Sequence, residues 1–337
     1  MATKTSVNIA PRVVAWESTR ACNYACSHCR ATAQKQPDPN QLTTQEALHM
    51  VDQIAAICKP VFIISGGDPL QRKDVFEVAS YASKLGFRVV MSPSGSDLTQ
   101  KTIDQMKQAG ICMISLSLDG ATAVIHDNFR NVPGAFDLVL KNISLANANN
   151  FSFRINTTIT QHNYKTIIPI HKTAVEAGAV EWDVFMLVPT GRGKIDMEIT
   201  PQQYEETLQA IYQISIASPI PVKVTCAPQY SRIVAQQTKE KPAMGGRGCM
   251  AGNGFCFISH TGDVFGCGFL PLRAGSIRQQ TLKEIYQQSP LFIELRNHHL
   301  LKGKCGKCPY SITCGGCRAR AFSTKNDYLE DEPYCIF

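Results

Sequence analysis

The chain has 337 residues, 44% of them apolar and 18% charged, which is enough apolar surface to bury a core and excludes a disordered or fibrous protein. Its 34 basic and 27 acidic residues give a net charge of +7. The basic residues are scattered and form no block that would follow a phosphate backbone, so we expect a small anionic substrate and no nucleic acid partner.

Apolar strand candidates alternate with amphipathic helix candidates through residues 1–220. The predicted strands are 12–17, 61–65, 87–91, 111–118, 151–159 and 180–188. The predicted helices are 43–57, 75–85, 99–110, 135–147, 166–177 and one that opens at Thr200-Pro201. Thr43 and Glu46 form a capping-box pair at the start of the first helix. Gly86, Gly110 and Gly178 are predicted to end three of the others.

Apolar strands that alternate with helices indicate a parallel sheet covered by helices. Six such units fit an open, partial (β/α)6 barrel or a doubly wound sheet, and the periodicity alone does not choose between them. In both architectures the chemistry lies at the carboxyl ends of the strands. Since eight of the cysteines follow residue 248, we expect an α/β domain over 1–220 and a smaller, cysteine-rich domain over 221–337.

No apolar run approaches the roughly 20 residues that span a bilayer. The N-terminal sequence MATKTSVNIAPR holds no hydrophobic stretch of signal-peptide length. We therefore expect a cytoplasmic protein with no membrane partner. The 14 cysteines, in a reducing compartment, argue against a disulfide framework and for metal or redox chemistry.

Glycine, cysteine and polar residues follow the predicted strands in turn. In chain order they are Cys22, Cys26 and Cys29, then Gly66, Gly67 and Asp68, then 92–96, Asp119, 158–160 and 189–193. Because the carboxyl ends of parallel strands meet at one edge of a sheet, we expect these segments to form a single site.

The first cysteine group, Cys22-x3-Cys26-x2-Cys29, lies on a predicted loop. A tetrahedral zinc ion or a cubane iron–sulfur cluster normally takes four protein ligands. Three thiolates on one loop can hold three corners of a cubane and leave one iron free for a substrate or cosubstrate. The alternative is a zinc site with His28 as fourth ligand, but His28 lies between two of the cysteines and is poorly placed to reach the same ion.

This loop resembles the signature of the radical S-adenosylmethionine (radical SAM) enzymes. Three further segments match in order: Ser65-Gly66-Gly67-Asp68-Pro69, SLSLDG with Ser117 and Asp119, and VPTGRG with Thr190 and Gly191. The resemblance implies a partial (β/α)6 TIM-like barrel. It also implies a [4Fe–4S] cluster bound by Cys22, Cys26 and Cys29, together with S-adenosylmethionine (AdoMet).

The same resemblance assigns the AdoMet contacts. It implies that the backbone of Gly66, Gly67 and Asp68 holds the methionyl amino group, although Asp68 replaces the usual glutamate and is one methylene shorter. Ser117 and Asp119 would face the ribose and the methionyl carboxylate, and Thr190 and Gly191 would lie beside the adenine. In this family, an electron from the reduced cluster cleaves the sulfonium bond and yields a 5′-deoxyadenosyl radical, and the protein holds a substrate C–H group beside it.

The eight cysteines after residue 248 resemble the SPASM domain, which carries auxiliary iron–sulfur clusters in many radical SAM enzymes. The resemblance implies one site of Cys249, Cys256, Cys267 and Cys317, and another of Cys305, Cys308, Cys314 and Cys335. The two-residue gap before Cys317 departs from the commoner three, which puts the first site in doubt. That site either has all four ligands, lacks one, or takes Cys226 as a ligand, so one or two auxiliary clusters are expected. Zinc ribbons are the alternative for paired cysteines.

Along essentially the whole chain the sequence is similar to the tetrapyrrole-modifying radical SAM enzymes, and among them to the heme b synthases of the siroheme-dependent pathway. The similarity is carried by VAWESTRACNYACSHCRA, FRNVPGAFD, FRINTT, VFMLVPTGRG, TCAPQY, GFCFISHTGDV and LLKGKCGKCPY. It implies oxidative decarboxylation of two propionates of iron-coproporphyrin III to vinyl groups. It further implies an auxiliary cluster as acceptor of the second electron, a flavodoxin- or ferredoxin-type electron donor, and a monomer.

A tetracarboxylate substrate favours guanidinium partners. Four arginines lie on segments near the predicted active face, although each is also explicable as a surface or structural residue: Arg30, Arg154, Arg192 and Arg247. The substrate iron is expected to take an axial ligand from Cys226 or from a loop histidine, namely His126, His162, His260 or His298. A buried thiol without a ligand role is the alternative for Cys226. Cys58 and Cys112 are expected to be buried core thiols.

Three other functions stay open. One is another tetrapyrrole-tailoring enzyme, which removes acetates from didecarboxysiroheme or propionates in the making of d-type heme. A second is a peptide maturase, although only about a dozen residues precede the first strand, where such enzymes often carry a precursor-recognition domain. The third is an iron–sulfur scaffold or electron carrier, in which the Gly66-Gly67 pair and Ser117 with Asp119 would have no purpose.

Overall fold

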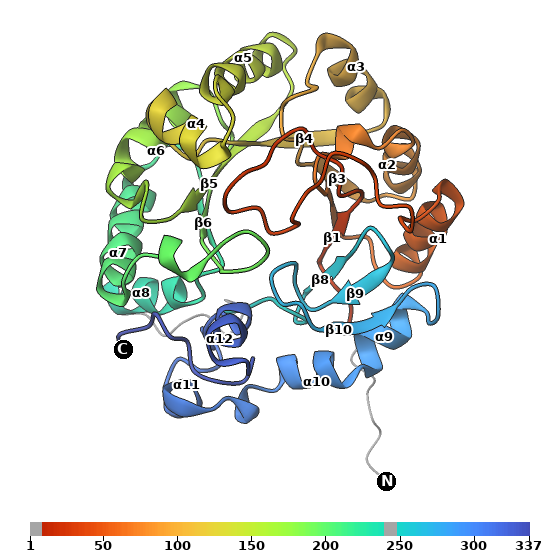
Figure 1. Cartoon of the computed structure of the whole chain (residues 1–337). Coiled ribbons are helices and arrows are strands. Elements are labelled where there is room, and N and C mark those ends of the chain that lie inside the picture. The colour runs from red at the N-terminus through yellow and green to blue at the C-terminus, as the bar shows by residue number, and fades with distance from the viewer. Residues whose placement is uncertain (1–8, 239–247) are drawn as a thin grey trace.

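The computed structural model describes residues 9–238 and 248–337 (Figure 1). Within them the strands are β1 Val13–Glu17, β2 Val61–Ser65, β3 Arg88–Met91, β4 Ile111–Ser117, β5 Phe153–Ile159, β6 Trp182–Met186, β7 Val222–Thr225, β8 Phe255–Ile258, β9 Asp263–Phe265 and β10 Arg273–Ser276. The α-helices are α1 Thr44–Ala55, α2 Val75–Lys84, α3 Gln100–Gln108, α4 Ala123–Arg130, α5 Ala135–Ala148, α6 Ile167–Glu176, α7 Pro201–Ala217, α8 Gln229–Thr238, α9 Leu282–Gln288, α10 Pro290–Arg296, α11 Gly303–Lys307 and α12 Arg318–Lys325. Short 3-10 helices are η1 Pro69–Gln71, η2 Tyr164–Thr166, η3 Ile195–Met197 and η4 His298–Leu300.

The described strands form one sheet in the order β10-β9-β8-β1-β2-β3-β4-β5-β6-β7. Strands β1 to β7 pair in parallel in chain order, and β8 pairs in parallel with the free side of β1. Strands β9 and β10 continue the sheet antiparallel, and a tight turn at Thr261-Gly262 joins β8 to β9. Figure 1 shows the sheet curved into an open ring with α1, α2, α3, α5, α6 and α7 outside it, which confirms the partial barrel.

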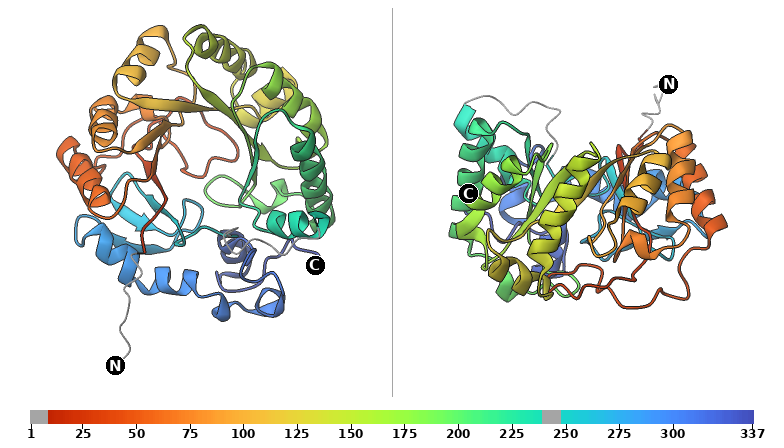
Figure 2. Two further views of the ribbon diagram at one scale, coloured as in Figure 1. Left: turned by 180° about the vertical axis from the view of Figure 1, so that it is seen from behind. Right: turned by 90° about the horizontal axis from the view of Figure 1, so that it is seen from above.

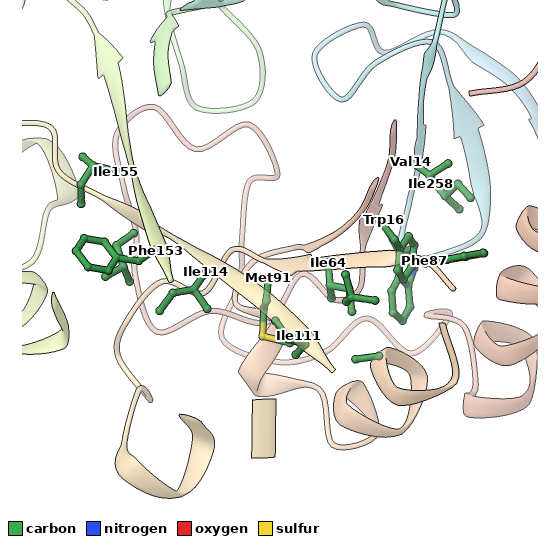
Figure 3. Close-up of a cluster of buried hydrophobic side chains, with 14 of the residues drawn as sticks. Val14, Trp16, Ile64, Phe87, Met91, Ile111, Ile114, Phe153, Ile155 and Ile258 are labelled. Atoms are coloured by element: carbon green, nitrogen blue, oxygen red, sulfur yellow. The ribbon is translucent and has the colours of Figure 1, made fainter. Parts of the chain in front are cut away.

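The hydrophobic core lies between the sheet and its outer helices. Alternate strand residues such as Val14, Trp16 and Ile64 point into this layer and are fully buried (Figure 3). The Trp16 ring stacks on Phe62, with centroids 6.2 Å apart. Each large apolar side chain that is buried in this way stabilises the fold by about 1.5–3 kcal/mol. The layer therefore fixes which face of each strand points toward the inside of the ring.

Side-chain caps begin several of the helices where the sequence predicted them. Thr43 accepts a hydrogen bond from the Glu46 amide at 3.3 Å, and the Glu46 carboxylate accepts one from the Thr43 amide at 2.8 Å. Thr200 and Gln203 form the same reciprocal pair at the start of α7, where Pro201 occupies the first turn. These pairs satisfy amide groups that a helix leaves without internal partners.

Three features differ from the sequence expectations. Helix α4, which starts at the cap Thr122 and ends at Asn131 with φ 55°, was not predicted, because its eight residues are too few for a clear apolar period. Cys112 is exposed at the start of β4, with its thiol donating to the Val89 carbonyl at 3.2 Å, so its prediction as a core thiol is wrong. Cys58 is partly buried and packs against the core.

The cysteine-rich C-terminal part packs along the open side of the ring, where Figure 1 shows α10, α11 and α12. Arg320 of α12 is fully buried and donates to the carbonyls of Leu187 at 2.6 Å and Cys226 at 3.1 Å, beyond the ends of β6 and β7. Its Nε also donates to Glu198 at 3.0 Å. The division at residue 220 stays a prediction, and strands on both sides of it belong to the same sheet.

Candidate active site

The long loop between β1 and α1 runs across the carboxyl ends of the strands (Figure 2, right) and carries the first three cysteines. Its backbone is tied to the loop after β2, because the Gly67 amide donates to the Thr19 carbonyl and the Asp68 amide to the Ala21 carbonyl, both at 2.7 Å. The Cys22 amide donates to the Gln34 carbonyl at 2.8 Å. The position of Cys22 is thus fixed from both sides by main-chain hydrogen bonds.

The two glycines after β2 permit this approach. A Cβ on Gly67 would lie 2.4 Å from the Ala21 carbonyl oxygen, and one on Gly66 would lie 2.5 Å from that of Thr19. Both contacts are too short for any side chain and involve backbone atoms. The Gly-Gly pair therefore has a packing role that the sequence did not reveal, and its binding of the AdoMet amino group stays a prediction.

The loop after β6 holds the other side of the cysteine loop. Gly191 has φ 66°, and a Cβ there would lie 2.3 Å from the Arg30 carbonyl oxygen. The Arg192 amide donates to Cys29 at 3.0 Å, and its guanidinium donates to the carbonyls of Cys26 and Ala33, both at 2.9 Å. Arg192 therefore supports the cysteine loop, and its Nη2 is buried without a hydrogen-bond partner. Thr190, two residues earlier, donates to the Phe269 carbonyl at 3.0 Å.

The three thiols of this loop fit a metal cluster. Cys22 and Cys26 are buried and Cys29 is partly so. Burial, together with the neighbouring Asp68, Cys26 and Cys29, raises the pKa of Cys22 to about 11. Bound iron supplies the positive charge that makes thiolates stable in such surroundings. The Arg130 guanidinium lies 3.8 Å from the Cys26 sulfur and offsets negative charge on this thiolate.

Asp68 links the loops after β2 and β3. Its Oδ1 accepts from the Leu70 amide at 3.0 Å and caps η1, and its Oδ2 accepts from Ser94 and, at 3.4 Å, from Ser96. Burial raises the pKa of this carboxyl group. The side chain is therefore occupied within the protein, and its backbone is the part that faces the cysteine loop.

Asp119, beyond β4, forms an ion pair with Arg130 of α4. Its Oδ1 also accepts from the Thr158 amide at 2.6 Å, and its own amide donates to His126 Nδ1 at 3.0 Å. Burial alone would raise the pKa of Asp119, but Arg130 and the hydrogen bonds hold it below its ordinary value. A small polar cavity beside this pair is lined by Tyr24, Ser94, Ser117, Arg130 and Asn142.

Ser117 lines this cavity, and its contact with AdoMet stays a prediction; Arg130, which also lines it, was not among the predicted site residues. Arg130 lies in FRNVPGAFD, one of the segments that carry the family similarity, but nothing in that segment marked the arginine as part of the site. His28, the alternative zinc ligand, stacks on Phe129 with centroids 4.1 Å apart. Burial lowers the pKa of His28 to about 3, so this ring is neutral.

Arg30 joins the cysteine loop to the C-terminal part. Its guanidinium pairs with Glu17 at 3.0 Å, donates to the Gly268 carbonyl at 3.4 Å and lies 4.5 Å from the centre of the Phe257 ring. Burial would raise the pKa of Glu17, but His260 and Arg30 lower it to about 2. Arg30 therefore lies between the first cysteine loop and the segment that holds Cys267.

Arg154, another of the predicted substrate arginines, does not gather with Arg30. Arg154 lies near the start of β5, where it donates to Ser115 at 2.7 Å and pairs with Glu181 at 3.2 Å. That position is at the amino end of the strand and contradicts the expectation that Arg154 faces the active side. Arg247 lies outside the described residues.

The candidate axial histidines are mostly engaged within the protein. His126 is held by the Asp119 amide, and His260 lies between Glu17 at 2.8 Å and Asp38 at 3.3 Å. His162 lies 6.3 Å from the Phe129 ring, and His298 packs on His299 at 4.1 Å. None of these contacts identifies an axial ligand.

The second predicted cysteine set lines one cavity in the C-terminal part. The cavity has a volume of about 290 Å³ and is bounded by Cys305, Cys308, Cys314 and Cys335 together with Arg232 and Lys304. Gly315 and Gly316, both with φ 66°, let the chain turn sharply between Cys314 and Cys317. Four free thiols around one cavity fit a cubane cluster.

The first predicted auxiliary set is not gathered as expected. Besides burial, charge on Cys249 and Cys317 raises the pKa of Cys267, and charge on Cys249 raises that of Cys317. For Cys256 the neighbouring thiol that raises the pKa is Cys58 instead. Cys256 is fully buried in the main hydrophobic core, so its prediction as a ligand with the other three is contradicted. Within the described residues no three His, Cys, Asp or Glu side chains converge closely enough for a single metal ion.

Comparison with known proteins assigns this arrangement to a family. Residues 16–177 match the radical SAM superfamily, and residues 249–309 match the SPASM iron–sulfur cluster-binding domain. The AdoMet-dependent heme synthase of Methanosarcina barkeri is 46% identical over 97% of both chains. That of Nitratidesulfovibrio vulgaris is 42% identical over 97% of this chain and 92% of its own. This chain belongs to the AdoMet-dependent heme synthase family.

Solved structures agree on the fold of this AdoMet-dependent heme synthase family member. Streptococcus suis SuiB bound to S-adenosylmethionine superposes with a TM-score of 0.78 at 16% identity, over 97% of this chain and 78% of its own. Native anSMEcpe with bound AdoMet gives 0.74 at 18% identity, over 96% and 93%. The chain is thus an enzyme of the radical SAM type, with a [4Fe–4S] cluster, AdoMet and auxiliary clusters as cofactors. No helix of residues 9–238 and 248–337 has the length and apolar character needed to cross a bilayer.

Proposed function

We propose that this heme synthase family member oxidatively decarboxylates two propionate side chains of iron-coproporphyrin III to vinyl groups and so forms heme b. The observation that carries the proposal is the 46% identity over 97% of both chains with an AdoMet-dependent heme synthase. A Methanosarcina barkeri protein named Fe-coproporphyrin III synthase is a more distant relative, at 27% identity. The rigid cysteine loop at the carboxyl ends of the strands supports the chemistry.

Each propionate loses one hydrogen atom, one CO2 and one further electron as it becomes a vinyl group. The bound cluster and AdoMet would supply hydrogen abstraction, and the auxiliary clusters would supply one-electron acceptance. Cys22, Cys26 and Cys29 would hold the first cluster, and Gly66, Gly67, Asp68, Ser117, Asp119, Thr190 and Gly191 would surround AdoMet. Cys305, Cys308, Cys314 and Cys335 would hold one auxiliary cluster.

The protein's own part is to fix these groups and to neutralise charge. Arg192, Gly67 and Gly191 keep the cysteine loop in one conformation. Arg130, beside Cys26 and paired with Asp119, places a guanidinium next to the cysteine loop, where it offsets negative charge on the thiolates. Arg30 lies between the two cysteine-bearing regions and is the predicted substrate arginine that this placement supports best.

We further propose a cytoplasmic monomer that receives electrons from a flavodoxin- or ferredoxin-type donor. Its thiols are all free, which suits a reducing compartment.

Cys308→Ala should spare AdoMet cleavage more than vinyl formation, because it damages only the proposed electron acceptor.

The test is product mass under strict anaerobiosis. Reconstituted protein is incubated with AdoMet, a reductant and iron-coproporphyrin III, and separately with didecarboxysiroheme. The proposal predicts that only iron-coproporphyrin III changes, losing CO2 and two hydrogens from each of two side chains. Acetate loss from didecarboxysiroheme would instead assign the enzyme to another step of tetrapyrrole tailoring.

A further inference from the structure

The register of β8 places Cys256 on the helix-covered face of the sheet. Cys256 pairs with Val14 and Ile258 with Trp16 in the parallel β1–β8 ladder. Figure 3 shows Val14, Trp16 and Ile258 together in the buried core. Since paired residues of neighbouring strands point to the same face, the Cys256 thiol points into that core and away from the inside of the ring. It is 0% exposed there.

Cys226, in contrast to Cys256, is placed close to the other cysteines. It lies directly after the carboxyl end of β7. Its φ of 62° is uncommon for a residue with a side chain and persists where the surroundings hold it. Those surroundings are visible: the Cys226 carbonyl accepts from Arg320 at 3.1 Å and from the Tyr204 hydroxyl at 3.3 Å. The strained backbone aims the side chain in a direction that an ordinary extended residue would not take.

That direction brings Cys226 to the other thiols. Cys226 and Cys267 both pack against the small buried cluster that contains Cys317, Val188 and Leu270. Cys226, Cys267 and Cys317, which come from three separate segments, therefore meet in one buried place.

Two further contacts tie the ligand segments together. The Cys317 amide donates to Glu332 at 2.7 Å, and Glu332 pairs with Arg320, whose guanidinium also holds the Cys226 carbonyl. The Cys249 amide donates to the Cys314 carbonyl at 3.2 Å, which sets Cys249 beside the neighbouring four-cysteine cavity. The turn 314–317 therefore sends one cysteine to each of two adjacent sites.

We propose that Cys226 is the fourth ligand of the first auxiliary [4Fe–4S] cluster, together with Cys249, Cys267 and Cys317, and that Cys256 is a core residue without a metal-binding role. Four thiolates complete a cubane without an open iron. The enzyme then carries three clusters. This ligand set depends on the SPASM assignment and not on which tetrapyrrole is the substrate.

The test counts clusters in matched variants of the full, anaerobically reconstituted protein. Wild type should contain about 12 iron atoms per chain, four for each [4Fe–4S] cluster. Cys226→Ala should lose about one to four of them, or show the electron paramagnetic resonance of a three-iron cluster, while AdoMet is still cleaved at the first site. Cys256→Val, which preserves an apolar core side chain, should keep the full iron content and an unchanged Mössbauer spectrum.

Cys226→Ser covers the case in which the alanine variant fails to fold, because it preserves the side-chain size. An altered Mössbauer signature for one cluster in this variant supports the ligand role, since an alkoxide or water would replace sulfur. A full iron content with an unchanged spectrum in Cys226→Ser overturns the proposal. So does a wild type with only about eight iron atoms, or loss of a cluster in Cys256→Val.

Discussion

Arg130 of α4 forms a buried ion pair with Asp119 beyond β4, and the same guanidinium lies 3.8 Å from the sulfur of Cys26. One cation therefore serves a carboxylate and a cluster thiol at once. Arg130 lines a small cavity that Ser117 also lines. It connects the predicted AdoMet residues to the cysteine loop.

Arg130→Gln should lower 5′-deoxyadenosine formation about tenfold or more while the iron content stays at the wild-type level. A charge-assisted hydrogen bond contributes about 1.5–3 kcal/mol, and each 1.4 kcal/mol is about a factor of ten. The measurement is the rate of 5′-deoxyadenosine release with dithionite. The double variant Arg130→Gln/Asp119→Asn removes the unpaired buried carboxylate and should recover stability without recovering the rate. An unchanged rate in Arg130→Gln would contradict the assigned role.

Gly67→Ala should prevent assembly of the cluster at Cys22, Cys26 and Cys29. The new Cβ would lie 2.4 Å from the Ala21 carbonyl oxygen, so the cysteine loop must move. Iron content should fall by about four atoms per chain, with the auxiliary clusters intact. The control is Gly134→Ala, at which a Cβ meets nothing within 4 Å despite φ 78°. It should cost about 1 kcal/mol and no iron. Full iron content in Gly67→Ala would refute the packing role.

Arg320→Met should lower the free energy of unfolding by about 3–5 kcal/mol, because it leaves buried carboxylates without their cation. Arg320 is fully buried between Glu198 and Glu332 and also donates to the carbonyls of Leu187 and Cys226. Anaerobic chemical denaturation measures the change. Arg278→Ala, which breaks a half-exposed pair with Glu46, is the control and should cost about 0–1 kcal/mol. Equal effects of the two variants would argue against Arg320 as the anchor of the C-terminal part.

Acidification should destabilise the protein through His126. Burial lowers the pKa of His126 to about 4 from 6.5, although Asp119 opposes the shift. Because the folded-state pKa is the lower one, the unfolded chain binds the proton first, and stability is lost as the pH falls from 6.5 toward 4. The loss reaches about 3 kcal/mol at the acid end.

His126→Asn keeps an acceptor for the Asp119 amide but does not titrate. Thermal unfolding of both proteins between pH 7 and pH 5, under anaerobic conditions, should therefore show a shallower decline for the variant. Replacement of the exposed His299 by asparagine is the matched control. A decline in His126→Asn as steep as that of wild type would rule out this histidine as the source.

The sequence predicted the six β/α units, because apolar strands and capped helices leave local signals that the structure confirms at Thr43 and Thr200. It also predicted the segments that meet at the carboxyl ends of the strands. It assigned Cys256 wrongly for a physical reason: Phe255–Ile258 is apolar throughout, so no alternation reveals which face each side chain takes. Pairing with β1, far away in the chain, decides it.

Other parts depended on contacts that no local pattern encodes. Arg320 meets carbonyl oxygens more than 90 residues earlier in the chain, and Arg192 supports a loop about 160 residues before it. Both arginines satisfy backbone oxygens at the junction of separate segments. Residue type favoured a substrate carboxylate for Arg192, whereas the fold supplied carbonyl partners instead.

The most direct test of the account uses iron-coproporphyrin III that carries deuterium at the β-carbons of its propionates. Reconstituted enzyme, AdoMet and a reductant are combined without oxygen, and both products are analysed by mass spectrometry. The account predicts one deuterium in each 5′-deoxyadenosine and two labelled molecules of it for every heme b. Unlabelled 5′-deoxyadenosine with an unchanged porphyrin would contradict it.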